Sequence, residues 1–261
     1  MLKILAFSDV HSPQYFNKFR RVTESLNFTP HLILIAGDLM EKGSLEGYNI
    51  LVNYLSSRFR DSRIIACPGN EDFENVLKNI IDKDHRVEWL IDREVSISIE
   101  GFKLRIYGSK GVLDKPTPWQ KKYIRDIEEI YQKRLEMIKN FINDVDSSKQ
   151  DLAILLLHYS PTYTTLEGEP SRIWPMLGTN KLEHDLKLVK SRLIVLHGHA
   201  HKSVNRKIVL GNSIILNVSF PEKWNVFLIT INEKLSIDIT LRGIEGTDYG
   251  KLRSSILDYL T

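Results

Sequence analysis

The chain has 261 residues, of which 42% are hydrophobic and 26% charged, and its formal net charge is +3. This balance is typical of a folded globular protein, the charge is too small to indicate nucleic-acid binding, and no apolar run is long enough to cross a membrane. The single cysteine, Cys67, cannot form an intrachain disulfide, so we expect a protein of the reducing cytoplasm.

The first third of the chain alternates short apolar runs with amphipathic segments. The apolar runs predict strands at residues 2–7, 32–36 and 63–67, and the amphipathic segments predict helices at about 14–27, 44–59 and 72–82. The N-terminal run meets Asp9 and His11 at once and lacks a cleavage site, so we interpret it as a strand and not as a signal peptide. Strands that alternate with helices in this way indicate a parallel sheet with right-handed crossovers.

The rest of the chain contains more strands than helices. Residues 95–109 predict a hairpin, and 117–146 predict one long amphipathic helix. Next come a strand ending at His158, a turn-rich loop over 160–180, a short helix, a strand ending at His197, two hairpins, and a helix at about 247–260. We expect an α/β fold with one domain over 1–261, built as two sheets packed face to face with helices outside and a helical insertion at about 116–146.

Side chains that can bind metal ions directly follow five of the predicted strands. They are Asp9 with His11, Asp38, Asn70, His158, and the group His197, His199 and His201. The carboxyl ends of parallel strands meet at one edge of a sheet, so we expect these side chains to lie together. Mixed imidazole and carboxylate donors suit Mn, Fe, Zn, Co or Ni better than Ca or Mg, and about seven donors exceed the needs of one ion. The sequence therefore predicts a site for two metal ions.

These motifs, in this order and spacing, resemble those of a known family. "DVH" at 9–11, "GDLM" at 37–40, "GNED" at 69–72, "LLLHYSP" at 155–161 and "GHAH" at 198–201 are similar to the pattern of the calcineurin-like metallophosphoesterases. The resemblance extends over about residues 1–220. It implies the αββα sandwich of that family, two bound metal ions, and hydrolysis of a phosphoester bond.

Transferred position by position, the resemblance implies a role for each ligand. The first metal ion would be held by Asp9, His11 and His201, the second by Asn70, His158 and His199, and Asp38 would bridge the two. A hydroxide between the ions would attack phosphorus, and Asn70 would also contact the phosphoryl oxygens. Manganese is the metal that we expect first, with iron, zinc, nickel and cobalt as alternatives.

One position departs from the family pattern. After Gly-Asn the family carries a histidine, which is generally assigned to phosphate contact and protonation of the leaving group; here the residue is Glu71, and Asp72 matches the acidic residue beside it. A carboxylate near the scissile bond repels a dianionic monoester more than a monoanionic diester, so we expect a phosphodiesterase. We count Asn70, Glu71 and Asp72 as catalytic, with Glu71 a general acid only if its pKa is raised. Alternatively, Glu71 points away from the site.

Several residues near the motifs are candidates for contact with the substrate. Arg172 is the candidate for phosphate contact, and Lys42, Gly43, Tyr159 and Trp174 are candidates to line the mouth of the site; the alternative for each is ordinary loop packing or a surface charge. We expect His197 to support the site without binding metal. The expected partner is a small phosphoester; nucleic acid is not indicated, and the oligomeric state is left open. The alternatives are a nuclease, a phosphomonoesterase, or a scaffold protein that lost turnover. The last is disfavoured because every ligand position still carries a ligand residue.

Overall fold

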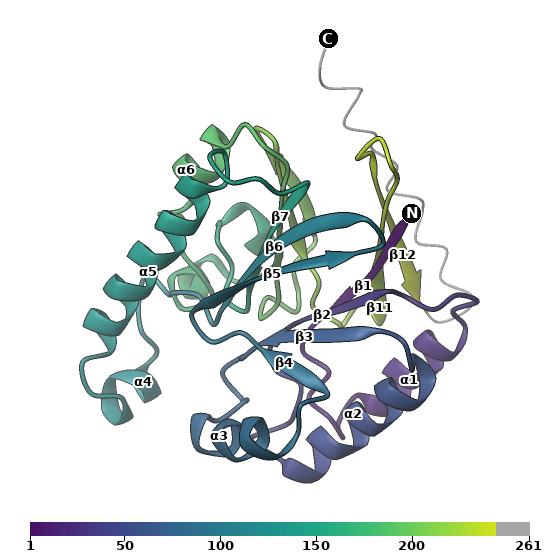
Figure 1. The fold of residues 1–261 in the computed structure, drawn as a ribbon. Coiled ribbons are helices and arrows are strands. Elements are labelled where there is room, and N and C mark those ends of the chain that lie inside the picture. The colour runs from purple at the N-terminus through teal and green to yellow at the C-terminus, as the bar shows by residue number, and fades with distance from the viewer. Residues whose placement is uncertain (244–261) are drawn as a thin grey trace.

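Two six-stranded sheets form the centre of this computed structural model, which describes residues 1–243 (Figure 1). The strands of the first sheet are β1 (Leu2–Phe7), β2 (Leu32–Ala36), β3 (Arg63–Cys67), β4 (Val87–Trp89), β11 (Asn225–Ile231) and β12 (Ile237–Gly243). Those of the second are β5 (Arg93–Ile99), β6 (Phe102–Ser109), β7 (Leu152–Leu157), β8 (Leu193–His197), β9 (Lys207–Leu210) and β10 (Ser213–Asn217). The spatial order is β12-β11-β1-β2-β3-β4 in the first and β5-β6-β7-β8-β10-β9 in the second. The helix predicted at about 247–260 lies outside the described residues.

The two sheets pack face to face, and helices cover their outer faces (Figure 1). On the first sheet lie α1 (Phe16–Glu24), α2 (Leu45–Arg58) and α3 (Glu74–Lys83), and on the second lie α5 (Ile127–Asp144) and α6 (Glu183–Leu188). Leu34 of the first sheet and Ile106 of the second are buried in the core between the sheets. Because side chains alternate along a strand, Ile33 and Ile35 pack under the helices instead. The predicted α/β sandwich is therefore confirmed.

The central strands of both sheets run parallel. β1, β2, β3 and β4 pair in parallel in the first sheet, as do β6, β7, β8 and β10 in the second. The antiparallel strands β11 and β12 extend the first sheet at one edge, and β5 and β9 form the two edges of the second. The central parallel strands are covered on both faces, which explains continuous apolar runs such as "LILIA" in β2, where every residue is buried. The polar loops after these strands therefore leave each sheet at one edge.

The segment predicted as one helix over 117–146 is divided in two. α4 (Pro118–Tyr123) and α5 are separated by a short break, where Asp126 has the left-handed backbone angle φ of 55°. The Thr117 hydroxyl accepts a hydrogen bond from the Gln120 N–H (3.2 Å), and the Gln120 side chain accepts one from the Thr117 N–H (2.8 Å), which caps α4. The apolar periodicity does not reveal the break because Ile124 and Ile127 continue the stripe across it.

Three short elements were not predicted. They are β4 and two 3-10 segments within the predicted loop, η1 (Thr164–Leu166) and η2 (Ser171–Met176). Segments of three to six residues carry too little periodicity to be distinguished from a loop. Among the helices of residues 1–243, none has the length and apolar character that crossing a membrane requires.

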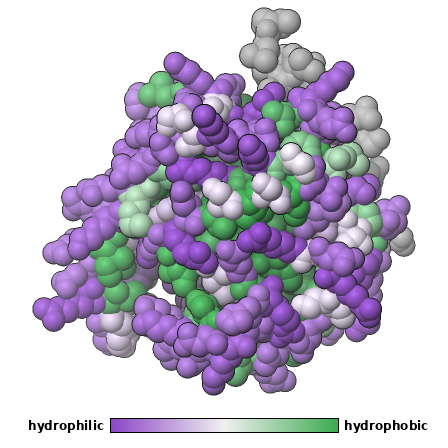
Figure 2. All heavy atoms as spheres, in the orientation of Figure 1, coloured by the Kyte–Doolittle hydropathy of each residue, from purple (hydrophilic) through white to green (hydrophobic). Residues whose placement is uncertain are grey.

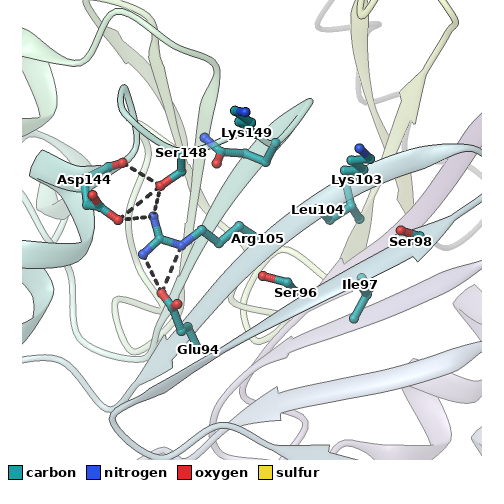
Figure 3. Close-up of a pocket in the computed structure, with 11 residues that line it drawn as sticks. Glu94, Ser96, Ile97, Ser98, Lys103, Leu104, Arg105, Asp144, Ser148 and Lys149 are labelled. Atoms are coloured by element: carbon teal, nitrogen blue, oxygen red, sulfur yellow. Dashed lines mark hydrogen bonds and ion pairs between the residues drawn. The ribbon is translucent and has the colours of Figure 1, made fainter.

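A network of charges ties α5 to the hairpin of β5 and β6 (Figure 3). Arg105 of β6 donates hydrogen bonds to Glu94 of β5 (2.7 Å) and Ser148 (2.6 Å), and it forms an ion pair with Asp144 at the end of α5 (2.8 Å). Every edge of the guanidinium group therefore contacts a partner. The network fixes the C-terminal end of α5 on the second sheet.

Candidate metal centre

Strand ends from both sheets bring the predicted ligands to one place. In the first sheet, Asp9 and His11 follow β1, Asp38 follows β2 and Asn70 follows β3. In the second sheet, His158 follows β7, and His199 and His201 follow β8. Donor atoms lie within 4.8 Å of one another in each of two groups, one of Asp9, His11 and His201 and the other of Asp38, His158 and His199. Asn70 adjoins the second group through His158. The structure thus places all the predicted metal ligands together.

The first group surrounds Asp9. Oδ1 of Asp9 lies 3.1 Å from Nε2 of His201 and 3.9 Å from Nε2 of His11. The backbone N–H of His199 (3.1 Å) and the Ser8 hydroxyl both donate to the same carboxylate and fix its orientation. Nε2 of His11 is buried and has no hydrogen-bond partner within the described residues. An unpartnered nitrogen that faces a carboxylate is the arrangement expected of a metal ligand.

The second group is built around His158. Its Nδ1 lies 2.9 Å from the carbonyl oxygen of Ala36, which can only accept, so Nδ1 carries the proton and the lone pair of Nε2 stays available. That Nε2 lies 3.0 Å from Oδ1 of Asn70 and 3.5 Å from Oδ2 of Asp38. The ring of His199 packs against that of His158 at a centroid distance of 4.9 Å. Nitrogen and oxygen donors therefore converge here as well.

Asp38, a member of the second group, also faces the first group. Its Oδ2 lies 3.5 Å from Nε2 of His158 and 3.8 Å from Nε2 of His11. Its other oxygen, Oδ1, accepts a hydrogen bond from the N–H of Glu71 (2.8 Å), which fixes the carboxylate plane. One oxygen between two sets of nitrogen donors is suited to hold two metal ions close together.

Four of the ligand positions have backbone angles that residues with side chains rarely adopt. The angle φ is 59° at Asp9, 42° at His11, 51° at Asp38 and 68° at His199. Each such conformation costs about 1–3 kcal/mol and persists only where the surrounding structure enforces it, as is common at functional sites. The directions of these ligands are therefore set by the packing of the loops.

Two glycines let the ligand loops approach one another closely. A Cβ atom at Gly69 would overlap the carboxylate of Asp38, and one at Gly198 would overlap Ser8 and the carboxylate of Asp9. A side chain at either position would push a ligand aside. The glycines of the Gly-Asn and Gly-His pairs are therefore required because the space beside them is filled by the ligands.

The buried charges perturb one another strongly. Burial raises the pKa of Asp9, but the charge of His201 and its hydrogen bond outweigh this effect and hold the pKa well below its usual range. Burial lowers the pKa of His11, but the hydrogen bond to Glu71 and the charge of Asp38 raise it to about 9. At neutral pH His11 therefore keeps a proton unless a cation displaces it.

The donor set fits two transition-metal ions. Imidazole nitrogens and carboxylate oxygens in this mixture are donors that Mn, Fe, Zn, Co and Ni accept. The unpartnered Nε2 of His11 and the available lone pair of His158 both face Asp38, so cations placed there would satisfy all three groups. The residues match a two-metal centre in chemistry and in position.

Glu71 has a direct partner in His11. Its Oε2 lies 3.1 Å from Nδ1 of His11 and accepts a hydrogen bond from the N–H of Lys42 (3.0 Å). The hydrogen bond from His11 lowers the pKa of Glu71, although partial burial acts in the opposite direction. The carboxyl group is therefore ionised and has no proton to give. The raised pKa that a general acid requires is therefore absent, and the contact with His11 shows that Glu71 does not point away from the site.

Asp72 holds two of the ligand loops together. Its buried carboxylate accepts hydrogen bonds from four backbone N–H groups, those of Asp38 (2.7 Å), Gly69 (2.8 Å), Leu39 (3.1 Å) and Met40 (3.3 Å). Burial and the charge of Asp38 raise the pKa of Asp72 to about 6. Because these contacts are all with the backbone, Asp72 positions Asp38. The catalytic role expected of Asp72 stays a prediction.

His197 supports the centre from within the second sheet. Its Nδ1 donates to the carbonyl oxygen of Gly198 (2.9 Å), and its Nε2 accepts from the hydroxyl of Thr165 (2.8 Å). Burial lowers the pKa of His197 to about 4. Both ring nitrogens are engaged, so His197 has no lone pair to offer a metal ion.

The predicted substrate contacts lie in different places. Lys42 and Tyr159 line a cavity beside the metal centre. Arg172 is exposed on η2 and is not among the residues that line this cavity, so its phosphate contact stays a prediction. Trp174 donates its indole N–H to the carbonyl oxygen of Glu169 (2.9 Å) and does not line the cavity either.

Two residues beside the centre were missed in the sequence. Lys110 directly follows β6 and lines the same cavity as Asn70 and His199, as does Trp119 of α4. Lys110 follows a strand parallel to β7, so its place at the same sheet edge was a usable signal. No sequence pattern placed Trp119 near the centre, because its position depends on how α4 packs.

Comparisons with known proteins agree with this architecture. The model of the family described as calcineurin-like phosphoesterase matches residues 2–203. No curated protein sequence gives a match. Among solved structures, the chain is similar to phosphopantetheinyl hydrolase from Mycobacterium tuberculosis, with 16% identity and a TM-score of 0.59 over 84% of this chain and 89% of that one.

Other similar structures are larger proteins. A 5'-nucleotidase precursor from Thermus thermophilus has 15% identity and a TM-score of 0.53 over 92% of this chain and 54% of that one. A sulfate thiohydrolase from the same organism has 12% identity and a TM-score of 0.53 over 92% and 56%. This chain thus spans little more than half of those two proteins, and identities this low show the fold alone. The family model matches most of the chain, and the chain belongs to the calcineurin-like phosphoesterase family.

Proposed function

We propose that this protein is a dinuclear metal-dependent phosphodiesterase. The observation that carries the proposal is the shared oxygen of Asp38, which lies 3.8 Å from Nε2 of His11 and 3.5 Å from Nε2 of His158. Membership of a phosphoesterase family supports hydrolysis of a phosphoester bond. The retained ligand set favours an enzyme over a scaffold that has lost turnover.

Each residue of the centre has a part in this proposal. Asp9, His11 and His201 would hold one ion, Asn70, His158 and His199 would hold the other, and Asp38 would contribute to both. When bound, the two ions supply Lewis acidity to the phosphoryl oxygens and lower the pKa of the attacking water. The amide of Asn70 keeps an N–H to donate to a phosphoryl oxygen while its Oδ1 faces His158. Asp72 holds the loop of Asp38, and Glu71 fixes the ring of His11.

Glu71 favours diesters over monoesters. Its carboxylate is ionised and lines the same cavity as Asn70. At neutral pH a monoester carries two negative charges and a diester one, so the repulsion by this carboxylate is about twice as large for the monoester. Since Glu71 has no proton to give, we also propose that esters with good leaving groups react fastest.

The test compares the hydrolysis of bis-p-nitrophenyl phosphate with that of p-nitrophenyl phosphate by metal-stripped protein, with and without added Mn²⁺. We expect turnover of the diester only with metal, at a rate that exceeds that of the monoester. Asn70→Ala should lower kcat about 100-fold, because the substitution removes a metal ligand and a hydrogen-bond donor together. Asn49→Ala, at an exposed position on α2, is the matched control and should retain the activity.

Each outcome bears on a different part of the proposal. Turnover that survives chelation or the Asn70→Ala substitution would contradict the metal centre. Faster hydrolysis of the monoester would contradict the diester preference and leave a phosphomonoesterase. If the protein binds Mn²⁺ in a calorimeter but hydrolyses neither ester, the scaffold alternative is favoured.

We further propose Mn²⁺ as the native metal and the cytoplasm as the compartment. The nitrogen and oxygen donors support the first proposal without separating Mn²⁺ from Fe, Zn, Ni or Co. The second rests on Cys67, which is buried as a free thiol. Metal analysis of protein purified from its native host without added metal tests the first.

A further inference from the structure

A cavity of about 560 Å³ opens beside the second group of metal ligands. Asn70 and His199 form part of its lining, and residues of α4, α5 and the loop before them form another part. Its volume lies within the range of about 300–1,000 Å³ that is typical of small-molecule sites. A phosphoester held at the metal centre would therefore extend into this cavity.

The lining away from the metal ligands is largely apolar and aromatic. It includes Phe73, Leu113, Trp119, Ile124, Ile130 and Tyr159. Trp119 is 59% exposed, Phe73 39% and Ile130 37%. Figure 2 shows hydrophobic surface on the side of the molecule where Figure 1 places α5. Large apolar side chains that remain exposed around one hollow indicate a binding surface, because their contact with water is unfavourable.

The connection between β6 and β7 is longer than its topology requires. A parallel crossover needs about 12 residues, whereas this connection spans 110–151. In the second half of α5, Ile138 and Phe141 pack on the second sheet, as the helix of a crossover does. In the first half, Ile127 and Tyr131 pack against Tyr159, beyond the end of β7. The first half of α5 and all of α4 therefore line the cavity and do not cover the second sheet.

One cation of the cavity is not neutralised by a close partner. The guanidinium of Arg134 forms an ion pair with Asp92 at 2.9 Å. Lys42 lies 3.5 Å from Glu41. Lys110 has no hydrogen bond or ion pair from its ammonium group within residues 1–243. Burial and the charge of Arg134 lower the pKa of Lys110, and only more distant carboxylates oppose this effect. An anion that enters the cavity would therefore be the close partner that this buried amine lacks and would favour its charged form.

We propose that this cavity is the subsite for an apolar or aromatic organic group of the substrate, and that Lys110 contacts the phosphate to which this group is bound. The inference rests on the proposed phosphodiesterase function and names its substrate class. That class is a phosphodiester in which one ester group is an aryl or extended alkyl group. Such a group would cover Phe73, Trp119 and Ile130, which a small polar group would leave in contact with water.

The test uses two analogues that cannot be hydrolysed at the varied group because it is joined by a P–C bond. They are dimethylphosphinic acid and methyl(1-naphthylmethyl)phosphinic acid, which carry the same single negative charge and contain no ester bond. Isothermal titration calorimetry with the Mn²⁺-loaded protein measures their affinities without any turnover. We expect the naphthyl analogue to bind at least about tenfold more tightly, a discrimination typical of an apolar pocket.

Equal affinity of the two analogues would overturn the subsite, whatever the hydrolysis assays show. Conversely, tighter binding of the naphthyl analogue by a protein that hydrolyses no phosphoester would establish the subsite and contradict the proposed function. The proposed subsite can therefore be contradicted without contradicting the phosphodiesterase function, and the reverse is also true.

Substitutions in the apolar lining of the cavity test whether the difference in affinity between the two analogues arises there. Ile130→Ser and Trp119→Ser should each lower the affinity for the naphthyl analogue and leave that for the methyl analogue unchanged. Met137→Ser, at an exposed position of α5 outside the cavity, is the matched control and should change neither affinity. If the variants of the lining weaken both analogues equally, the apolar subsite is overturned.

Lys110 is tested separately. Lys110→Met should weaken both analogues by the same factor, because both carry the same anionic group, whereas exposed Lys115→Met should weaken neither. Unchanged affinities in Lys110→Met would overturn its contact with phosphate.

Discussion

Oε2 of Glu71 lies 3.1 Å from Nδ1 of His11, and the opposite nitrogen of the same ring faces Asp38 at 3.8 Å. A carboxylate that accepts a hydrogen bond from the outer nitrogen of a metal-binding histidine fixes the ring and its tautomer and makes the inner nitrogen a stronger ligand. The residue that departs from the family pattern is thus connected to the metal centre through His11.

Removing the negative charge of Glu71 should weaken metal binding. Glu71→Gln keeps an oxygen that accepts from His11 but removes the negative charge, so we expect the affinity for Mn²⁺ to fall about 10- to 100-fold. Isothermal titration calorimetry measures the change. Glu74→Gln, an exposed neighbour whose carboxylate pairs with Lys78, is the control. Unchanged Mn²⁺ affinity in Glu71→Gln would show that the contact with His11 has no influence on the metal.

Restoring the residue of the family pattern should change the substrate preference. Glu71→His removes the ionised carboxylate from the cavity, and with it the extra repulsion of a dianionic monoester. We expect the ratio of monoester to diester kcat/KM to rise about tenfold, which corresponds to about 1.4 kcal/mol. The p-nitrophenyl esters described above give this ratio. A ratio equal to that of the wild type would mean that Glu71 does not set the preference.

Asp72 should matter for stability as well as for activity. Its carboxylate accepts four backbone hydrogen bonds, and Asp72→Asn replaces one of the accepting oxygens by an amide nitrogen, which can only donate. We expect the free energy of unfolding to fall by about 3 kcal/mol, measured by urea denaturation. Exposed Asp82→Asn is the control and should unfold as the wild type does. Equal stability of the two variants would contradict the positioning role.

The buried imidazole of His197 should make the protein less stable in acid. Its pKa is about 4 in the folded protein against the usual 6.5, so between these values the unfolded chain binds the proton and the folded chain does not. The stabilisation is complete above about pH 6.5 and is lost as the pH falls towards about 4, by about 3 kcal/mol in total. Urea denaturation over this range, in the presence of a chelator, measures the loss.

Comparison with a variant isolates this effect from other titrating groups. The raised pKa of Asp72 acts in the opposite sense, since it stabilises the fold at low pH and this contribution is lost as the pH rises through about 6. The informative quantity is therefore the difference in the free energy of unfolding between the wild type and His197→Asn. We expect this difference to become smaller as the pH falls. The exposed His85→Asn variant should follow the wild type. A difference that does not vary with pH would contradict the assignment.

The metal ligands could be predicted from the sequence because the order of the strands in the sheet determines where these residues lie. A continuous apolar run such as Leu32–Ala36 indicates a strand covered on both faces, and such strands are parallel. Their carboxyl ends share an edge, so a polar residue such as Asp38 at each end is enough to predict a cluster. The fold class and the grouping of ligands follow from the same pattern.

Interactions that depend on loop conformation were not accessible. The residue type and sequence position of Asp72 do not reveal its contacts, and only the direction of its side chain shows that it binds backbone N–H groups. The break before α5 lies in a segment whose apolar stripe continues, so one helix was predicted. Trp119, on α4 before that break, lines the cavity beside the metal centre, and its position depends on how α4 packs.

The left-handed backbone angles of Asp9, His11, Asp38 and His199 carry a consequence for engineering. A glycine adopts such angles without strain, so replacing a ligand by glycine relieves a cost that the intact centre bears. His11→Gly should therefore lose less stability than His11→Ala in metal-free protein, although both lose a ligand. The strained backbone at these ligands supports metal binding but lowers the stability of the metal-free protein. A library of variants selected for thermal stability alone would therefore favour substitutions that remove metal ligands.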